Sequence, residues 1–158
     1  MAFDNLALSN LSHSNLSGAN LYGTNMTNAT LFGANLSGAS LYSADLTGAF
    51  LSVVDLSGAN LNQAILTNAN LTRTNLSGAN LYQAILSGAN LFTADLSGAN
   101  LDGANLSGAT LTRANLFGAN LLGATTTGVT WGFNTKCPDG TYSQNNGSTP
   151  TCDGHLNY

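Results

Sequence analysis

Leucine recurs every five residues through most of the chain, and this spacing restricts the fold more than any other feature. The twenty-four positions taken at this interval from Leu6 to Leu121 are all Leu except Met26. Three residues after each central position, and thus two before the next, alanine fills nineteen of the twenty-four places from Ser9 to Ala124. A fixed period of this kind is typical of a repeat architecture in which every group forms the same small unit.

A period of five fits neither a helix, whose period is 3.6 residues, nor a long strand, whose period is two. Within one group, alanine and leucine lie two residues apart, so a short extended segment points both side chains to the same side. The residues between a leucine and the next alanine must then turn the chain. A turn of roughly a right angle after every five residues closes a square after four groups, which predicts a coil of twenty residues.

Glycine indicates the type of turn. It occupies the second place after the leucine in fourteen groups from Gly18 to Gly128, and a type II turn needs a positive φ at this residue. The same place holds residues that resist a positive φ, namely Val53, Arg73, Thr93 and Arg113. We therefore expect a turn of another type at these four corners.

Successive coils should stack through backbone hydrogen bonds about 4.8 Å apart, the ordinary spacing of β-strands. The four leucines of each coil would fill its centre, and the four alanines would fit near its walls. Residues twenty positions apart should therefore lie directly above one another.

The groups also match a known consensus, A(D/N)LXX, as in Ala19-Asn20-Leu21 and Ala94-Asp95-Leu96. In this pattern the chain resembles the pentapeptide-repeat family over roughly residues 4 to 130. The resemblance implies an all-β fold, a right-handed quadrilateral β-helix, here with about six four-sided coils and a C-terminal capping segment. We expect an N-terminal lid at residues 1–8, the β-helix at 9–128 and the cap at 129–158.

Both ends of the repeat carry apolar residues that could cover its core. Phe3 and Leu8 interrupt polar positions at the start, and Trp131 and Phe133 follow the last leucine group. We expect these four side chains to cap the β-helix, because the ends of a solenoid need shielding from water. An uncovered first coil would instead offer strand edges for self-association, which would make a homodimer through an end coil.

The C-terminal segment contains both cysteines of the chain. Cys137 and Cys152 enclose two strong turn signals, Pro138-Asp139-Gly140 and Asn145-Asn146-Gly147,. We predict a disulfide between them; the alternative is two free thiols in a reducing compartment. A secreted, periplasmic or lumenal location is favoured if the disulfide forms, and a cytoplasmic one otherwise. The chain as given contains no membrane span and no visible leader.

Stacking at twenty residues gathers large side chains into columns on the outer surface. Tyrosines share one column, phenylalanines a second, and two isoleucines stand where the chain otherwise prefers Asn or Asp. Such columns indicate either a docking surface or ordinary stacking of like side chains on a flat sheet. The candidate interaction residues are Tyr22, Tyr42, Tyr82, Phe32, Phe92, Ile65 and Ile85.

The residues for catalysis are sparse. The two histidines, His13 and His155, lie near opposite ends of the expected rod, and all seven acidic residues are Asp. Asp45, Asp55 and Asp95 stand where the consensus accepts Asn or Asp, which indicates repeat positions and not catalytic carboxylates. We therefore expect no enzyme activity, no cofactor and no metal site.

Three functions remain. The first is a rigid interaction rod with an unknown protein partner. The second comes from the resemblance, because some family members protect or inhibit DNA gyrase by imitating duplex DNA. Duplex DNA carries one negative charge per about 1.7 Å, whereas the coil offers five Asp against Arg73 and Arg113. The coil would therefore imitate the charge of DNA only weakly.

The third function is ice or surface binding by the hydroxyl column from Thr27 to Thr127. Nucleic-acid binding by a basic patch is excluded, because the chain has only three Lys and Arg residues,.

Overall fold

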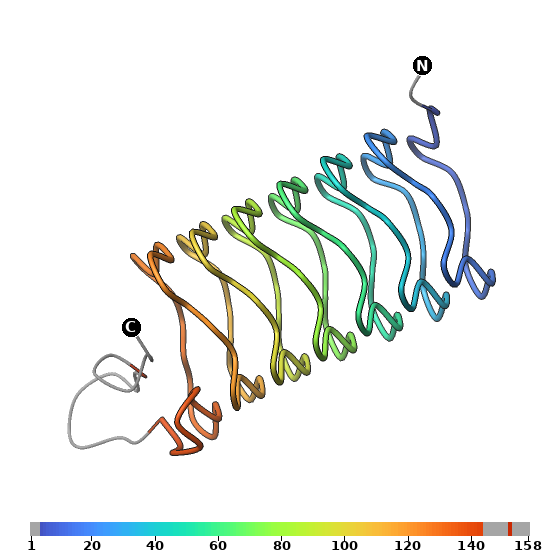
Figure 1. Cartoon of the computed structure of the whole chain (residues 1–158). Helices are drawn as coiled ribbons and strands as arrows, with labels where there is room; N and C mark the ends of the chain where they lie inside the picture. Colours follow the sequence, from blue (N-terminus) through green and yellow to red (C-terminus); the bar gives the residue numbers. More distant parts are fainter. Residues whose placement is uncertain (1–3, 144–151, 153–158) are drawn as a thin grey trace.

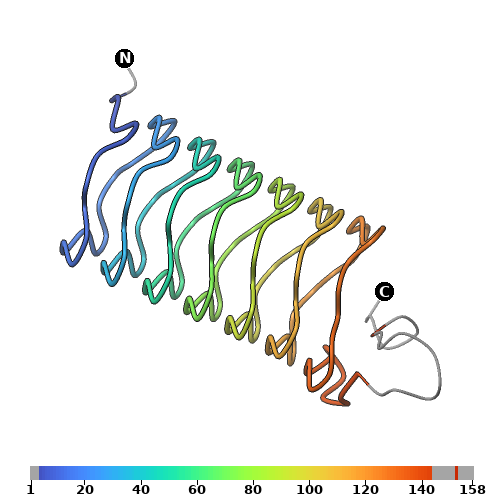
Figure 2. The ribbon, with the colours of Figure 1, turned by 180° about the vertical axis from the view of Figure 1, so that it is seen from behind.

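A computed structural model describes residues 4–143 and 152 of the 158-residue chain. The chain winds into stacked coils, with the earliest coils at one end of the rod and the segment around residues 130–143 at the other (Figures 1 and 2). Within the described residues, no helix is present and the β-structure consists of single-residue bridges between turns. This part of the chain therefore offers no helix that could cross a membrane.

Parallel bridges join residues twenty positions apart on four sides of the coil. The four ladders begin at Asn5, Asn10, Asn15 and Asn20, and each climbs the rod in steps of twenty residues. This arrangement confirms the predicted twenty-residue coil with four sides. Six windings separate Asn5 from Thr125.

The core is a column of leucine inside the coil. From Leu31 to Leu121 every central leucine has at most 1% of its surface exposed, and Met26 is fully buried. The alanine positions are buried beside them, with Val54 and Thr74 as larger substitutes. The Thr74 hydroxyl donates to the Leu51 carbonyl at 2.6 Å, which satisfies its polar group inside the core,. The three earliest leucines, Leu6, Leu11 and Leu16, are only partly buried because no coil covers them on one side.

Hydrogen bonds between the coils use most of the backbone. From Leu6 to Leu111 each central residue donates its N–H to a carbonyl nineteen residues ahead, as does the second corner residue from Leu8 to Gly108. The N–H of the alanine position closes the turn. In one group these three bonds run from Leu46 to Ile65 at 2.7 Å, from Gly48 to Thr67 at 2.9 Å, and from Ala49 to Leu46 at 3.0 Å. The residue before the leucine donates back to the preceding coil, as Asp45 does to Thr24 at 3.0 Å.

The remaining N–H, on the residue after the leucine, is bound by a side chain wherever the residue before the leucine is Asn or Asp. All fifteen Asn and all three Asp of the bridge column accept this N–H through Oδ1, at 2.9 to 3.2 Å. This local Asx bond completes the backbone pairing of a group whose turn leaves one donor over. The Asn column therefore supports the fold in addition to solubility, a role that the repeat pattern alone did not predict.

The prediction of a second turn type at four corners is wrong. Val53, Arg73, Thr93 and Arg113 have φ values of 62°, 59°, 56° and 61°, within the range of the glycines at the other corners. The same bond, from the N–H of the alanine position to the leucine carbonyl, closes these turns. A turn of four residues whose third residue alone has positive φ is of type II. Each corner must match the corner above it, since the Arg73 N–H donates to the Phe92 carbonyl at 3.0 Å. This requirement overrides the local preference for negative φ, and the left-handed conformation costs about 1–2 kcal/mol of stability for each non-glycine residue.

The C-terminal cap begins with a one-residue shift in the ladder. Thr110 pairs with Thr130 at the usual spacing of twenty, whereas Asn115 pairs with Lys136 at twenty-one. Lys136 also pairs antiparallel with Tyr142, which turns the chain back across the last coil. The ladder thus continues beyond Leu121, although the leucine pattern ends there.

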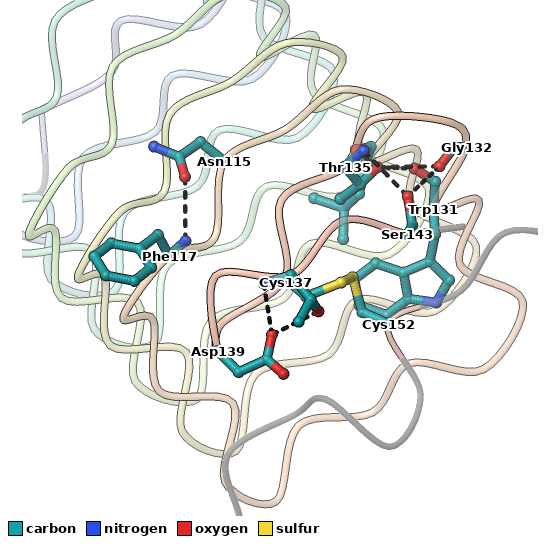
Figure 3. The surroundings of a disulfide bond; sticks show 11 residues. Asn115, Phe117, Trp131, Gly132, Thr135, Cys137, Asp139, Ser143 and Cys152 are labelled. Atoms are coloured by element: carbon teal, nitrogen blue, oxygen red, sulfur yellow. Dashed lines mark hydrogen bonds between the residues drawn. A yellow bond between two sulfur atoms is a disulfide. The ribbon is translucent and has the colours of Figure 1, made fainter.

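Buried groups fill the cap, and a disulfide joins it (Figure 3). Trp131 is 4% exposed, and Cys137 and Cys152 are fully buried and bonded to each other, as predicted. The buried Thr135 hydroxyl contacts the Leu111 carbonyl at 2.8 Å and the Trp131 carbonyl, so that the cap is bonded to the coil below.

The other expected caps lie elsewhere. Phe133 is 55% exposed and Leu8 is 78% exposed, with Leu8 at a corner of the first coil where its N–H donates to Thr27. Their side chains thus point away from the core ends they were expected to cover, because corner positions face outward. Phe3 lies outside the described residues.

The strain at the corners predicts opposite effects for two exchanges. Thr93→Gly should raise the stability by about 1 kcal/mol, because glycine adopts positive φ without the steric penalty and this outweighs its larger unfolded-state entropy. Gly98→Thr should lower it by a similar amount, since a Cβ there meets open space and only the backbone, at φ 64°, opposes the change. Urea unfolding of both variants measures the difference. Stability changes of the same sign would contradict the account.

The cap predicts a local effect of the disulfide. Replacing both Cys137 and Cys152 by Ala should lower the stability by about 3 kcal/mol, the chain-entropy value for a loop of this size. Amide exchange should accelerate at Leu116, whose N–H donates to the Lys136 carbonyl, and stay slow at Leu66 in the middle of the rod. Hydrogen exchange with mass spectrometry resolves the two regions. Equal acceleration at both would show that the cap does not act locally.

Candidate interaction surface

The candidate surface residues fall on two corners of the coil that are separated by half a winding. Tyr42 and Phe32 each come directly after a central leucine, and they lie ten residues apart, which is half of the twenty-residue coil. The structure therefore brings the tyrosines and isoleucines together on one part of the rod. It places Phe32 and Phe92 on the opposite corner.

Tyrosine and glutamine side chains form a bonded ladder along the first of these corners. The Tyr22 and Tyr42 rings stack with 5.4 Å between centroids and 3° between planes. The Tyr42 hydroxyl donates to Gln63 Oε1 at 2.8 Å, Gln63 Nε2 reaches Gln83 Oε1 at 3.4 Å, and Gln83 Nε2 donates to the Tyr82 hydroxyl at 3.2 Å. This Tyr–Gln ladder, formed by Tyr22, Tyr42, Gln63, Tyr82 and Gln83, holds five surface side chains in one arrangement.

The two isoleucines adjoin the Tyr–Gln ladder. Ile65 and Ile85 pair with each other on the side that follows this corner, and each stands two residues after a ladder glutamine. Ile85 is 38% exposed and Ile65 is half-buried. Neither side chain can accept the Asx bond that Asn or Asp provides at this position, so both replace a stabilising group by an apolar surface.

Two further exposed apolar residues lie near the opposite corner, and neither was among the candidate interaction residues. Phe50 is 52% exposed and Val53 is 47% exposed, beside Phe32 at 45%. The signal was present in the sequence, because Phe50 replaces the usual Asn and Val53 replaces the usual Gly. His13 lies edge-on to Phe32, with 5.5 Å between ring centroids. Phe92 is half-buried on the same corner.

Three aspartates in the bridge column of the coil accept hydrogen bonds from neighbouring groups of the same chain. Asp45, Asp55 and Asp95 are half-buried, and each accepts a backbone N–H. Asn75 Nδ2 donates to Asp55 Oδ1 at 3.1 Å, and Asn115 Nδ2 donates to Asp95 Oδ1 at 3.0 Å. The described part of the chain holds no group of three His, Cys, Asp or Glu residues that could bind a metal. The geometry around these acidic groups is that of a bonded repeat surface.

Comparison with known proteins gives the same fold. The family model for pentapeptide repeats matches eight copies, over residues 9–48, 55–91 and 94–128. No curated protein sequence matches the chain significantly. Among solved structures, a pentapeptide repeat protein from the thylakoid lumen of Arabidopsis thaliana is 32% identical, with a TM-score of 0.51; the match covers 73% of this chain and 70% of that one.

Two more solved structures are similar over shorter parts of their own length. The pentapeptide repeat protein Rfr23 from the cyanobacterium Cyanothece 51142 is 40% identical over 66% of this chain and 58% of its own, with a TM-score of 0.32. A trypsin-treated variant of QnrB1, a plasmid-mediated fluoroquinolone resistance protein, is 24% identical over 70% of this chain and 61% of its own, with a TM-score of 0.47. With the family model matching more than half of its residues, the chain belongs to the pentapeptide repeat family.

Proposed function

We propose that the protein is a non-enzymatic interaction scaffold, a rigid right-handed β-helical rod that binds a protein partner. The observation that carries this proposal is the Tyr–Gln ladder beside Ile65 and Ile85. It combines apolar area with hydrogen-bonding groups, the mixture that protein interfaces favour in their aromatic residues.

The rigidity of this surface supports a binding role. Binding usually loses affinity through the ordering of flexible side chains, at about 0.5–1.5 kcal/mol for each. The glutamines of the ladder are already held by bonds to Tyr42, to each other and to Tyr82. A partner would therefore meet a surface whose ordering is complete before contact.

The chemistry of the ladder indicates what the partner would offer. Its five side chains and the two isoleucines are uncharged, so long-range charge attraction contributes little at this surface. The partner that fits is a polypeptide segment with apolar side chains for the isoleucines and with backbone or amide groups for the Tyr and Gln atoms that face solvent.

Regulation of DNA gyrase by imitation of duplex DNA is the alternative, and the charge of the coil argues against it. A rod of six windings spaced by about 4.8 Å would need on the order of seventeen negative charges to match the duplex, at one charge per about 1.7 Å. The coil carries Asp4, Asp45, Asp55, Asp95 and Asp102 against the two arginines. The acidic side chains are also spread over different columns instead of forming two parallel lines.

We also propose an oxidising location, such as a lumen or periplasm. The Cys137–Cys152 disulfide supports it, because disulfides persist where thiols are not kept reduced,. The thylakoid lumen is the reported location of the similar Arabidopsis protein.

The interaction role is tested by comparing partners of matched variants. The tagged wild-type protein, Ile85→Asp and the control Ser57→Asp, on a Ser–Gly corner, are used for quantitative affinity purification from the source cell. We expect the wild type and the control to recover the same partner reproducibly. With Ile85→Asp the affinity for that partner should fall at least about tenfold, which corresponds to a loss of about 1.4 kcal/mol of binding free energy. A partner that all three proteins retain equally, or no reproducible partner at all, contradicts the proposal.

A further inference from the structure

The corner opposite the Tyr–Gln ladder keeps more side chains at positive φ than any of the other three corners of the coil. We call it the arginine corner; it consists of the residue pairs 12–13, 32–33, 52–53, 72–73, 92–93 and 112–113. Its second positions are His13, Gly33, Val53, Arg73, Thr93 and Arg113, and all of them have positive φ. On the next corner the six equivalent positions, from Gly18 to Gly118, are all glycine. The arginine corner therefore keeps side chains where the backbone favours their absence.

The bonds between coils impose positive φ on this corner, so each non-glycine residue there lowers the stability. A side chain that is kept at such a cost indicates a function. Val53 leaves 47% of its surface exposed in this conformation. Phe50, on the side that leads to this corner, gives up the Asx bond and is also exposed. With Phe32, these residues form an apolar patch in which two of three members break the local rule of the repeat.

Charge follows the same corner. Arg73 and Arg113 are the only arginines of the chain, and both lie exposed at this corner. Asp55 and Asp95 lie on the adjoining side, each eighteen residues before one of the arginines. Asp55 accepts hydrogen bonds from the Ser57 N–H and from Asn75 Nδ2 through Oδ1, which leaves Oδ2 for a guanidinium. The corner thus presents both signs of charge in a repeating arrangement.

We propose that the arginine corner binds a second copy of this chain in an antiparallel side-by-side dimer. A two-fold axis midway between the coil of Val53 and the coil of Arg73 places Phe32 opposite Phe92 of the partner subunit. The same axis brings Arg73 level with the coil that holds the partner's Val53 and the partner's Asp55. A two-fold interface repeats each contact, so this one surface supplies two aromatic pairs and two ion pairs.

The alternative orientations fit less well. A parallel dimer sets every residue against its own copy, which brings Arg73 against the partner's Arg73 and Arg113 against the partner's Arg113, and like charges in contact oppose association. A different acidic protein could neutralise the arginines, but it would meet Asp55 and Asp95 at the same surface. The pair Arg73 and Asp55 matches a copy of the chain turned end for end, and Arg113 then lies level with the partner's His13.

Sedimentation of the whole protein tests the association. An interface at a corner is small, so we expect a weak dimer with a dissociation constant on the order of 10–100 μM. The protein should be monomeric at about 5 μM and mainly dimeric at about 500 μM. The double variant Phe50→Asn, Val53→Gly restores the repeat consensus and should fold at least as well, yet its dissociation constant should rise at least about tenfold. The matched control Ile85→Asn, on the other part of the rod, should dimerise as the wild type does.

Spin labels on single cysteine variants test the orientation. With coils about 4.8 Å apart, the antiparallel dimer separates the two labels of Ser52→Cys by about one coil along the rod and those of Ser12→Cys by about five coils. A parallel dimer gives the same separation at both sites. Three results would each overturn the proposal. They are a monomer at about 500 μM, an unchanged dimer in the Phe50→Asn, Val53→Gly variant, and equal label distances at the two sites. Binding of a different protein at this corner by a monomeric rod would do so as well.

Discussion

The hydrogen bonds between successive coils are the constraint on which this structure depends. Along the body of the rod, each group of five residues donates to the coil above and to the coil below, and the repeat offers no helix or long strand that could hold the chain by itself. Each corner must therefore reproduce the geometry of its neighbours. This explains why Arg73 adopts the same left-handed conformation as Gly58, although an isolated chain would disfavour it. The leucine column supplies the apolar burial, and the ladder determines where each leucine stands.

The same constraint divides the side chains by task. Leucine and alanine face inward, and the bridge column binds the one N–H that the ladder leaves over. Asn and Asp do this equally well, as Asn60 and Asp55 show with bonds of 3.2 and 3.0 Å. Departures from these two rules are consequently informative. The two isoleucines beside the Tyr–Gln ladder, and Phe50 with Val53 at the arginine corner, each give up a local stabilisation and leave an exposed apolar group. The interaction proposals rest on these departures, because nothing in the fold itself requires them.

The sequence was sufficient to predict the coil of twenty residues and the leucine core, because the five-residue spacing determines them. It also favoured the disulfide over two free thiols, since Cys137 and Cys152 enclose strong turn signals. It was not sufficient at the corners, where a prediction from the φ preference of Val53 and Arg73 ignored the bonds to the next coil. The role of Asn was missed for a related reason: the pattern showed that the position is polar, but the unpaired donor it serves becomes apparent only when every backbone N–H is followed to its partner. Leu8 and Phe133 were assigned to the caps by their apolar character, whereas their corner positions expose them. Phe50 and Val53 could have been found by listing the positions that violate the consensus.

The central claim, that the ladder imposes one corner geometry on every residue, can be measured directly by NMR. Scalar couplings across hydrogen bonds connect the amide nitrogen of a donor with the carbonyl carbon of its acceptor. The account predicts such a coupling between Arg73 and Phe92 and between Val53 and Thr72, equal in size to the one between Gly58 and Ser77, because all three bonds have N···O distances of 2.9 to 3.0 Å. Couplings at the glycine corner with none at Arg73 and Val53 would contradict it, and would show that these corners follow their local preference after all.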